Sequence, residues 1–270
     1  MEREKLQIKA VAIDLDGTLL DDARNIPRST QALLRELAGQ GIQVVLASAR
    51  PLCAVVPYAE QLALQTPVIA LSGACVFRPA GEKYLFEAPL AKALYQNLIG
   101  FFAAKNYHLK IYGRSRLFVR EAIAETLRYA ENFQVPYTEL GAAGLAKPTE
   151  DIFRIFIHRV PAAEVGFLQA DLARLFPELA VTKFEDNGIE ILCRGISKGN
   201  AVAKVCSLQG ISMEEVMAIG NDGCDISMVT QAKVGVAMGN SCQELIAVAD
   251  EITGKNTELG VEQVLTKYLR

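Results

Sequence analysis

The stretch IKAVAIDLDGTLL (residues 8–20) decides the fold, because an aliphatic run passes directly into two acids, Asp14 and Asp16, and then into Gly17. A run rich in β-branched and aliphatic residues is typical of a strand buried on both faces of a parallel sheet. Gly17 allows the backbone to turn after such a strand. The two acids would then stand at the carboxyl end of a central strand, where open α/β sheets bind their ligands.

Downstream of this stretch, apolar runs alternate with amphipathic stretches. The pattern predicts a helix over 27–40, a strand over 42–47, a helix over 51–64 and a strand over 67–71. The alternation returns near the end of the chain, with helices expected over 197–208, from about 225, over 241–248 and over 257–268, and strands over 216–219 and 233–237. Short links between strand, helix and strand require parallel pairing with right-handed crossovers. We therefore predict an α/β fold with a doubly wound, mostly parallel, Rossmann-like core.

The middle of the chain follows a different pattern. Between about residues 81 and 188 the expected strands are longer and farther apart, as in DIFRIFIH (151–158), and helical patterns over 89–105 and 120–133 lie between strand pairs. This arrangement is typical of an inserted α+β domain. We expect a catalytic core formed by residues 1–80 and 190–270, and an α+β cap domain formed by residues 81–189.

Composition limits the classes of partner. The 270 residues carry 28 Lys and Arg against 31 Asp and Glu, so no basic field exists to hold a nucleic acid or an anionic membrane. The start is charged, and the longest uncharged run, 61–77, is too polar to span a bilayer. Six cysteines without a C-x-x-C pair and two histidines supply no Cys/His metal site. We expect a cytoplasmic monomer or homodimer whose partner is a small molecule.

Polar residues follow several of the expected strands. Asp14 and Asp16 would repel each other without a compensating cation, and hard carboxylate oxygens suit Mg²⁺; a capped Asp-Gly turn explains the pair equally well. Ser48-Ala49 at a helix start favours an anion, although Ser48 alone is better explained as an N-cap. Lys198 at another helix start opposes the helix dipole unless it faces an anion. A further polar cluster, residues 220–225, follows a late strand.

Six motifs in order carry a resemblance to a known family: DLDGTLL (14–20), LASAR (46–50), GISKGNAV (195–202), IGNDGCDISM (219–228), VGVAMGNS (234–241) and ADEIT…N…GV (249–261). On these motifs the chain resembles, over essentially its whole length, the haloacid dehalogenase-like (HAD) phosphohydrolases. Within them it is similar to the Cof-type sugar-phosphatase branch with a type-two, subtype-B cap. The resemblance implies a Mg²⁺-dependent phosphomonoesterase that acts on small phosphorylated metabolites, sugar phosphates in particular, through an aspartyl-phosphate.

The resemblance also implies roles for individual residues. Asp14 would attack phosphorus, and Asp16 would serve as acid for the leaving alcohol and then as base for water. Lys198 would complete the catalytic set. The phosphoryl group would be bound by Lys198, Ser48, Cys224 and the main-chain amides of Leu15 and Ala49. Mg²⁺ would be held by Asp14, the main-chain carbonyl of Asp16, Asn221 and Asp225.

Several positions depart from the family pattern, among them Ser48-Ala49 in place of Thr-Gly and Ile246 in place of a commonly cationic residue. Asn221 stands where the family usually has Asp, which removes one negative charge, and Cys224 stands where it has Asn. Ser72 stands where another Asn is expected. Two alternatives therefore stay open: a metabolite-binding or regulatory protein that has lost metal affinity, and a phosphosugar mutase, since phosphomannomutases share this type of cap.

Overall fold

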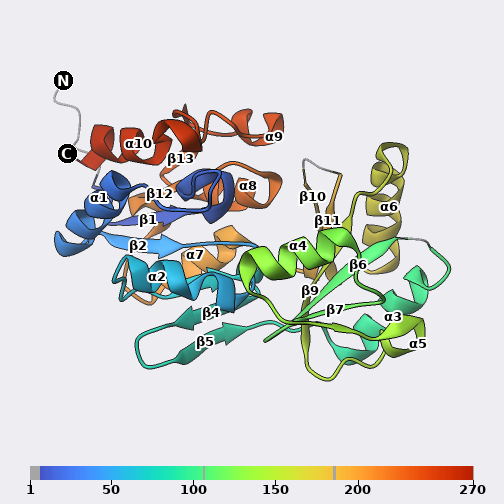
Figure 1. The fold of residues 1–270 in the computed structure, drawn as a ribbon. Coiled ribbons are helices and arrows are strands. Elements are labelled where there is room, and N and C mark those ends of the chain that lie inside the picture. Colours follow the sequence, from blue (N-terminus) through green and yellow to red (C-terminus); the bar gives the residue numbers. More distant parts are fainter. Residues whose placement is uncertain (1–6, 106, 185–186, 270) are drawn as a thin grey trace.

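A computed structural model describes residues 7–105, 107–184 and 187–269, and Figure 1 shows its two lobes side by side. The strands are β1 (Ala10–Ile13), β2 (Gln43–Leu46), β3 (Val68–Ala70), β4 (Cys75–Arg78), β5 (Lys83–Glu87), β6 (His108–Gly113), β7 (Leu117–Val119), β8 (Tyr137–Glu139), β9 (Ile152–His158), β10 (Leu179–Lys183), β11 (Ile189–Cys193), β12 (Val216–Gly220), β13 (Val234–Ala237) and β14 (Glu251–Ile252). The α-helices are α1 (Arg28–Gly39), α2 (Val56–Gln61), α3 (Lys92–Phe102), α4 (Ala124–Phe133), α5 (Gly141–Gly144), α6 (Ala162–Leu175), α7 (Lys198–Ser207), α8 (Ile226–Gln231), α9 (Gln243–Ile246) and α10 (Gly260–Leu269).

The core sheet is parallel throughout and has the order β14-β13-β12-β1-β2. Strand β1 lies between β12 and β2, and Ile13 is in register with both Ile219 and Leu46. The three strands therefore end at the same edge. Because their carboxyl ends coincide, the residues that follow them meet there, although they are far apart in the chain.

Alternate residues of β1 supply the two faces of the core. Val11 and Ile13 belong to one buried cluster with leucines of α1 and valines of α10. Ala10 and Ala12 belong to another with residues of α7 and α8. Helices thus cover both faces, as Figure 1 also shows, and the predicted doubly wound α/β core is confirmed.

The cap is built on a second sheet, with the order β10-β11-β9-β6-β7-β8. Its pairs are antiparallel except for β7 with β8. Helices α3 and α6 contribute to a separate buried cluster with this sheet. The inserted α+β cap expected from the middle of the sequence is therefore confirmed as a structural unit with its own core.

A small third sheet, β3-β4-β5, lies at the junction. The strand expected over 67–71 is present as β3, but it pairs antiparallel with β4 and reaches β2 through a single parallel bridge, Ala47 to Ile69. Strand β5 joins β4, and β11 belongs to the cap sheet. The boundaries between core and cap at 80/81 and 189/190 stay a prediction. The membership of the strands in the three sheets favours links between core and cap over 88–91 and 194–197.

The helix expected over 51–64 is interrupted in the structure, and the one expected over 241–248 is reduced to α9. The segment 51–64 forms a short turn over 52–54 and then α2 over Val56–Gln61. Pro57 lies in the first turn of α2, where its missing N–H costs no hydrogen bond, whereas its ring would clash in the interior of one longer helix. In the described part of the chain, no helix has the length and apolar character needed to cross a membrane.

Candidate active site

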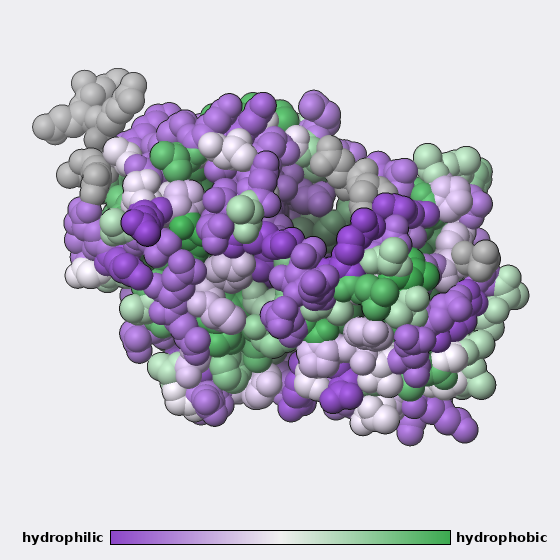
Figure 2. All heavy atoms as spheres, in the orientation of Figure 1, coloured by the Kyte–Doolittle hydropathy of each residue, from purple (hydrophilic) through white to green (hydrophobic). Residues whose placement is uncertain are grey.

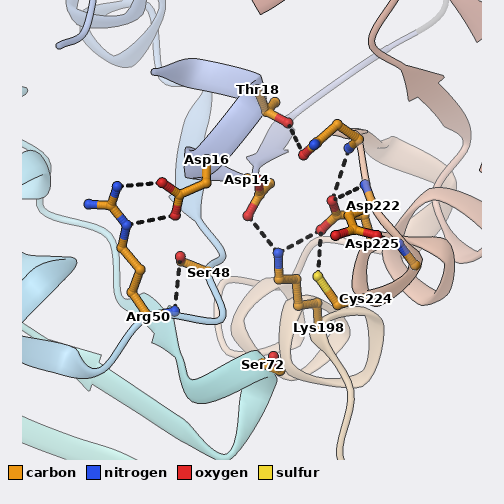
Figure 3. A network of polar contacts seen from close by, with 12 residues as sticks. Asp14, Asp16, Thr18, Ser48, Arg50, Ser72, Lys198, Asp222, Cys224 and Asp225 are labelled. Atoms are coloured by element: carbon orange, nitrogen blue, oxygen red, sulfur yellow. Dashed lines mark hydrogen bonds and ion pairs between the residues drawn. The ribbon is translucent and has the colours of Figure 1, made fainter. Parts of the chain in front are cut away.

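A buried ion triad lies at the carboxyl ends of the central strands. Lys198 Nζ lies 2.6 Å from Asp14 Oδ1 and 2.6 Å from Asp225 Oδ1. Lys198, Asp14 and Asp225 are 1, 4 and 0 % exposed, and Figure 3 shows the ammonium between the two carboxylates. Because an ammonium carries three protons, one remains for a further acceptor beside Asp14.

Burial and charge set the protonation states in this triad. The pKa of Asp14 is raised to about 7, first by burial and then by the charge of Asp225, against the opposing effect of Lys198. Burial alone would lower the pKa of Lys198, but Asp14 and Asp225 outweigh it and hold that pKa well above its usual range. The ammonium therefore stays charged, and Asp14 is poised between acid and carboxylate near neutral pH.

Helix α7 carries the lysine of the triad. The expected N-cap is confirmed, because Ser197 Oγ accepts a hydrogen bond from the main-chain N of Asn200 at 3.2 Å. Lys198 is the first helical residue, a position that the helix dipole disfavours for a cation. The two carboxylates offset this cost, which explains why a lysine stands there.

The loop after β12 is folded around Asp225. Its Oδ2 accepts hydrogen bonds from the main-chain N of Asn221 and of Asp222, at 2.9 and 3.1 Å. Since its Oδ1 faces Lys198, both carboxylate oxygens are engaged by donors of the protein. Asp225 thus fixes the loop and the lysine at the same time.

Asp16 turns away from the triad, as Figure 3 shows. Arg50 Nε donates to Asp16 Oδ2 at 2.7 Å and Arg50 Nη2 to Asp16 Oδ1 at 2.5 Å, which is a bidentate pair. The Arg50 side chain is 4 % exposed and that of Asp16 is 48 % exposed. Asp16 therefore faces solvent at the sheet edge but is held in one orientation by a buried guanidinium.

Aromatic rings from both lobes cover the guanidinium of Arg50. Its Cζ lies 5.2 Å from the ring centroid of Tyr58 in the core and 4.3 Å from that of Phe133 in cap helix α4. Arg24 Nη2 donates to Asn132 Oδ1 beside it, at 3.0 Å. The cap thus touches the group that orients Asp16.

Hydrogen-bond donors surround the space in front of Asp14. In the part of the chain that the structure describes, the main-chain amides of Leu15 and Ala49 donate to no protein acceptor. Ser48 Oγ accepts from the main-chain N of Arg50 at 3.2 Å, so its own proton is available. These donors and the ammonium of Lys198 suit an oxyanion with several acceptor atoms.

Oxygen atoms also converge beside Asp14 on the end of the Asn221 side chain. When the NH₂ group of Asn221 faces them, it lies 2.8 Å from the main-chain O of Asp16, 3.0 Å from Thr18 Oγ1 and 3.3 Å from Asp14 Oδ2. Over residues 7–105, 107–184 and 187–269, no three His, Cys, Asp or Glu side chains form a metal-binding cluster. A cation here would rely on one carboxylate and two neutral oxygens, from the Asp16 carbonyl and the Asn221 amide. These hard oxygens fit Mg²⁺ chemically, with less charge than two carboxylates supply.

A polar network joins core and cap on the other side of the site. Ser72 Oγ donates to Glu190 Oε1 at 2.6 Å, and Arg154 Nε donates to the same oxygen. All three side chains are buried. Ser72 stands where the family usually has Asn, and in the structure its hydroxyl is committed to Glu190 of the cap strand β11.

A cavity of about 630 Å³ lies beside Lys198, between the two lobes. The core lines it with Cys224 and Cys242, and the cap lines it with Lys183 and Phe184. Figure 2 shows the surface hollowed where the lobes meet. Burial first, and then the charge of Asp225, raise the pKa of the Cys224 thiol well above its usual range. Cys224 is therefore a neutral, weak donor, 3.8 Å from Asp225 Oδ1.

The structure brings four of the expected site residues into one group, whereas the side chain of Asp16 turns to Arg50. Asp14, Lys198, Asp225 and Asn221 form one contiguous group. Arg50 belongs to the motif LASAR, but the sequence pattern predicted no role for it. An arginine directly after the expected phosphate-binding residues was the available signal. Its partner on the cap, Phe133, had no signal in the sequence.

A family model described as haloacid dehalogenase-like hydrolase matches residues 11–265. The chain belongs to this family. It is a HAD-type phosphatase of the Cof-type, subclass IIB branch, as the order of motifs implied. The match spans both lobes, so the cap is part of the family architecture.

Similar proteins cover the chain end to end. The phosphatase YwpJ of Bacillus subtilis is 28 % identical over 97 % of this chain and 100 % of its own length. The pyridoxal phosphate phosphatase YbhA of Escherichia coli is 29 % identical over 97 % of this chain and 98 % of its own. A 5-amino-6-(5-phospho-D-ribitylamino)uracil phosphatase of B. subtilis, YcsE, is 28 % identical over 100 % and 99 %.

Solved structures share the fold. A haloacid dehalogenase-like hydrolase from B. subtilis superposes with a TM-score of 0.86 at 24 % identity, covering 97 % of this chain and 100 % of that one. The HAD subclass IIB sugar phosphatase BT4131 superposes with a TM-score of 0.84 at 20 % identity, covering 96 % and 98 %. At these identities the likeness concerns the arrangement of core and cap.

Proposed function

We propose that this phosphatase hydrolyses monophosphate esters of small metabolites, with sugar phosphates as the class to test first, through an aspartyl-phosphate on Asp14. The observation that carries the proposal is the position of Lys198, whose ammonium lies 2.6 Å from Asp14 and keeps one proton for a phosphoryl oxygen. A carboxylate approaches a phosphate dianion only where such positive potential is present.

In the first step an oxygen of Asp14 attacks phosphorus. Lys198, the Ser48 hydroxyl and the amides of Leu15 and Ala49 hold the other phosphoryl oxygens and stabilise the charge that develops on them. Cys224 lies at the same edge, but as a neutral thiol it contributes a weak contact at most. The covalent intermediate replaces one displacement by two, and each of the two has a lower barrier than the direct attack of water.

Asp16 then serves both half-reactions. Arg50 holds its carboxyl group at the sheet edge, where it protonates the departing alcohol and later removes a proton from the attacking water. The bidentate pair fixes the direction of both oxygens, so the transferred proton has a defined path. The cap excludes bulk water during these steps.

The family generally uses Mg²⁺, and we propose the same ion for this site. Asp14, the Asp16 carbonyl and Asn221 would hold it, whereas Asp225, named as a ligand on the resemblance, would act on it through Lys198 and the loop. When bound, the ion supplies positive charge between nucleophile and phosphoryl oxygens. The chain's own residues perform the remaining work described above.

The relatives support a small, phosphorylated substrate without naming it. YbhA acts on pyridoxal phosphate and YcsE on a ribitylamino-uracil phosphate. Both substrates are single metabolites with one phosphate ester. The contact set that selects among such metabolites lies on the cap, and a panel of phosphorylated metabolites would identify the class.

The alternative of a metabolite-binding protein without activity is favoured by one observation, the neutral Asn221 at the cation position. The mutase alternative has no such support. Measuring inorganic phosphate and rearranged sugar phosphate in the same reaction distinguishes a hydrolase from a mutase and from a non-catalytic binding protein.

The test uses p-nitrophenyl phosphate with and without Mg²⁺. We expect hydrolysis by the wild type and its loss in Asp14→Asn, while the control Asp171→Asn, which removes an exposed carboxylate on cap helix α6, keeps full activity. Activity that survives Asp14→Asn would sink the proposal. Tight metabolite binding without turnover under any divalent metal would instead establish the non-catalytic alternative.

A further inference from the structure

The carboxamide of Asn221 lies among acceptor oxygens. The main-chain O of Asp16, 2.8 Å away, has no proton to give, and a carboxylate at Asp14 has none either. An amide oxygen turned inward accepts a hydrogen bond from Thr18 Oγ1 at 3.0 Å, but it also faces the oxygens of Asp16 and Asp14, which repel it unless a cation lies among the three. The NH₂ group turned toward them makes hydrogen bonds to Asp16, Thr18 and Asp14 instead.

The rest of Asn221 is fixed. Its main-chain N donates to Asp225 Oδ2 at 2.9 Å, and its main-chain O accepts from the N of Cys242 at 2.9 Å. The other end of the carboxamide lies against Gly17, where a Cβ would come within 2.6 Å of it. The remaining freedom is a half-turn of the amide plane, which exchanges NH₂ for oxygen. An aspartate at this position has no NH₂ group and cannot make the hydrogen bonds that the inward-facing NH₂ group makes.

We propose that the Asn221 carboxamide is an internal stand-in for the divalent cation of this site. With NH₂ inward it bridges the Asp14 carboxylate and the Asp16 carbonyl, so the nucleophile loop keeps its geometry without metal. Binding of a cation requires the amide to turn its oxygen inward, so the ion must displace the hydrogen bonds to Asp16 and Asp14, whereas Thr18 donates to the turned oxygen. The inference deepens the proposed function and rests on it for its catalytic meaning, but not for its test.

The net charge of the site also supports this role for the neutral Asn221 side chain. With Asp14 ionised, the triad of Asp14, Lys198 and Asp225 carries one net negative charge, and an ionised aspartate at 221 would double it. A neutral amide therefore weakens the attraction for a dication while it removes the need for one in the resting protein. The chain would be folded and ordered at the site when Mg²⁺ is scarce.

The experiment measures metal binding and thermal unfolding on the whole protein stripped with EDTA, without substrate. Mg²⁺ alone is titrated by calorimetry into the wild type, Asn221→Asp and the control Asn132→Asp, which adds the same charge on the cap. We expect Asn221→Asp to bind Mg²⁺ at least about tenfold more tightly than the wild type. We also expect it to melt several degrees lower in EDTA and to recover when Mg²⁺ is added.

Wild-type protein should melt at nearly the same temperature in EDTA and in Mg²⁺, and Asn132→Asp should match its metal affinity. An Asn221→Asp chain that folds in Mg²⁺ but not in EDTA also supports the inference. It is overturned if the wild type itself loses several degrees in EDTA, or if Asn221→Asp binds Mg²⁺ no more tightly and is as stable without it.

The two proposals fail separately. If the metal and melting results are as expected but no Asp14-dependent hydrolysis is found, the stand-in role holds and the proposed function falls. If hydrolysis depends on Asp14 while the wild type needs Mg²⁺ for its melting temperature, the proposed function holds and the stand-in role falls.

Discussion

Asp14 and Asp16 are two residues apart, yet the structure gives them opposite surroundings. Asp14 is buried and paired with an ammonium that it shares with Asp225. Asp16 is half exposed and paired with a guanidinium that also touches the cap. One short motif therefore supplies two chemical roles. A nucleophile needs a charge-balanced position with little water, whereas a proton carrier needs access to the leaving group and to water.

The two surroundings also differ in what they depend on. The Asp14 side is built from core strands and helices, and side-chain oxygens of Ser197 and Asp225 accept main-chain hydrogen bonds that hold α7 and the loop after β12 in place. The Asp16 side depends on contact between lobes, through Phe133. The first should therefore withstand changes in the cap, and the second should respond to them.

Lys198→Met breaks the Asp14 side and should have the largest effect. It leaves two buried carboxylates without their cation, so we expect activity to fall by about 10³-fold or more and stability by about 3–5 kcal/mol. Hydrolysis rates and denaturant unfolding check this. Lys267→Met, an exposed lysine paired with Glu251, should change neither; a mild loss in Lys198→Met would contradict the account.

Arg50→Lys breaks the Asp16 side while it keeps the charge. A lysine cannot form the bidentate pair, so Asp16 loses its fixed direction and we expect kcat/KM to fall roughly 10- to 100-fold on an alkyl phosphate such as a sugar phosphate. The loss of kcat/KM, which reports formation of the aspartyl-phosphate and not its hydrolysis, should be much smaller on p-nitrophenyl phosphate, whose leaving group needs no acid. Arg35→Lys serves as the control; equal losses on both substrates would show that Arg50 does not act through Asp16.

The sequence predicts the Asp14 side of the site, which the core builds, better than the Asp16 side, which depends on the cap. The strand ends and the order of motifs were predictable, because a buried parallel strand, its polar end and the capped helix at Ser197 leave local patterns. The contact of Arg50 with Phe133, and that of Ser72 with Glu190, join residues more than eighty positions apart across two lobes. Their pairing depends on how the cap sits on the core, and no local pattern encodes that. The orientation of the Asn221 amide depends likewise on oxygens brought in from another strand.

Phe133→Leu tests the cap contact with a smaller change. The leucine still fills apolar space but lacks the ring face over the guanidinium, so we expect kcat/KM on a sugar phosphate to fall about three- to tenfold with little change in kcat/KM on p-nitrophenyl phosphate. Leu127→Ala, on an exposed part of the same helix, should leave both rates unchanged. The same loss in both variants would assign the effect to the helix rather than to the ring.

The pH dependence of stability distinguishes the two acids by a measurement that needs no catalytic activity. The pKa of Asp14 is raised to about 7, chiefly by burial, so its contribution to folding is present at low pH and is lost as pH rises toward that value. In EDTA, Asp14→Asn should therefore gain stability over the wild type by roughly 2–3 kcal/mol between pH 5 and pH 8. Thermal unfolding at both pH values measures this, and a gain that is the same at both would be inconsistent with a raised pKa.

The central claim, that Asp14 becomes phosphorylated, is tested most directly by trapping. In Asp16→Asn, attack on p-nitrophenyl phosphate proceeds because the leaving group needs no acid, while hydrolysis of the intermediate lacks its base. Acid quenching, borohydride reduction and peptide mass spectrometry should then find homoserine at position 14. Reduction at another carboxylate, or none while phosphate is still released, would contradict the account.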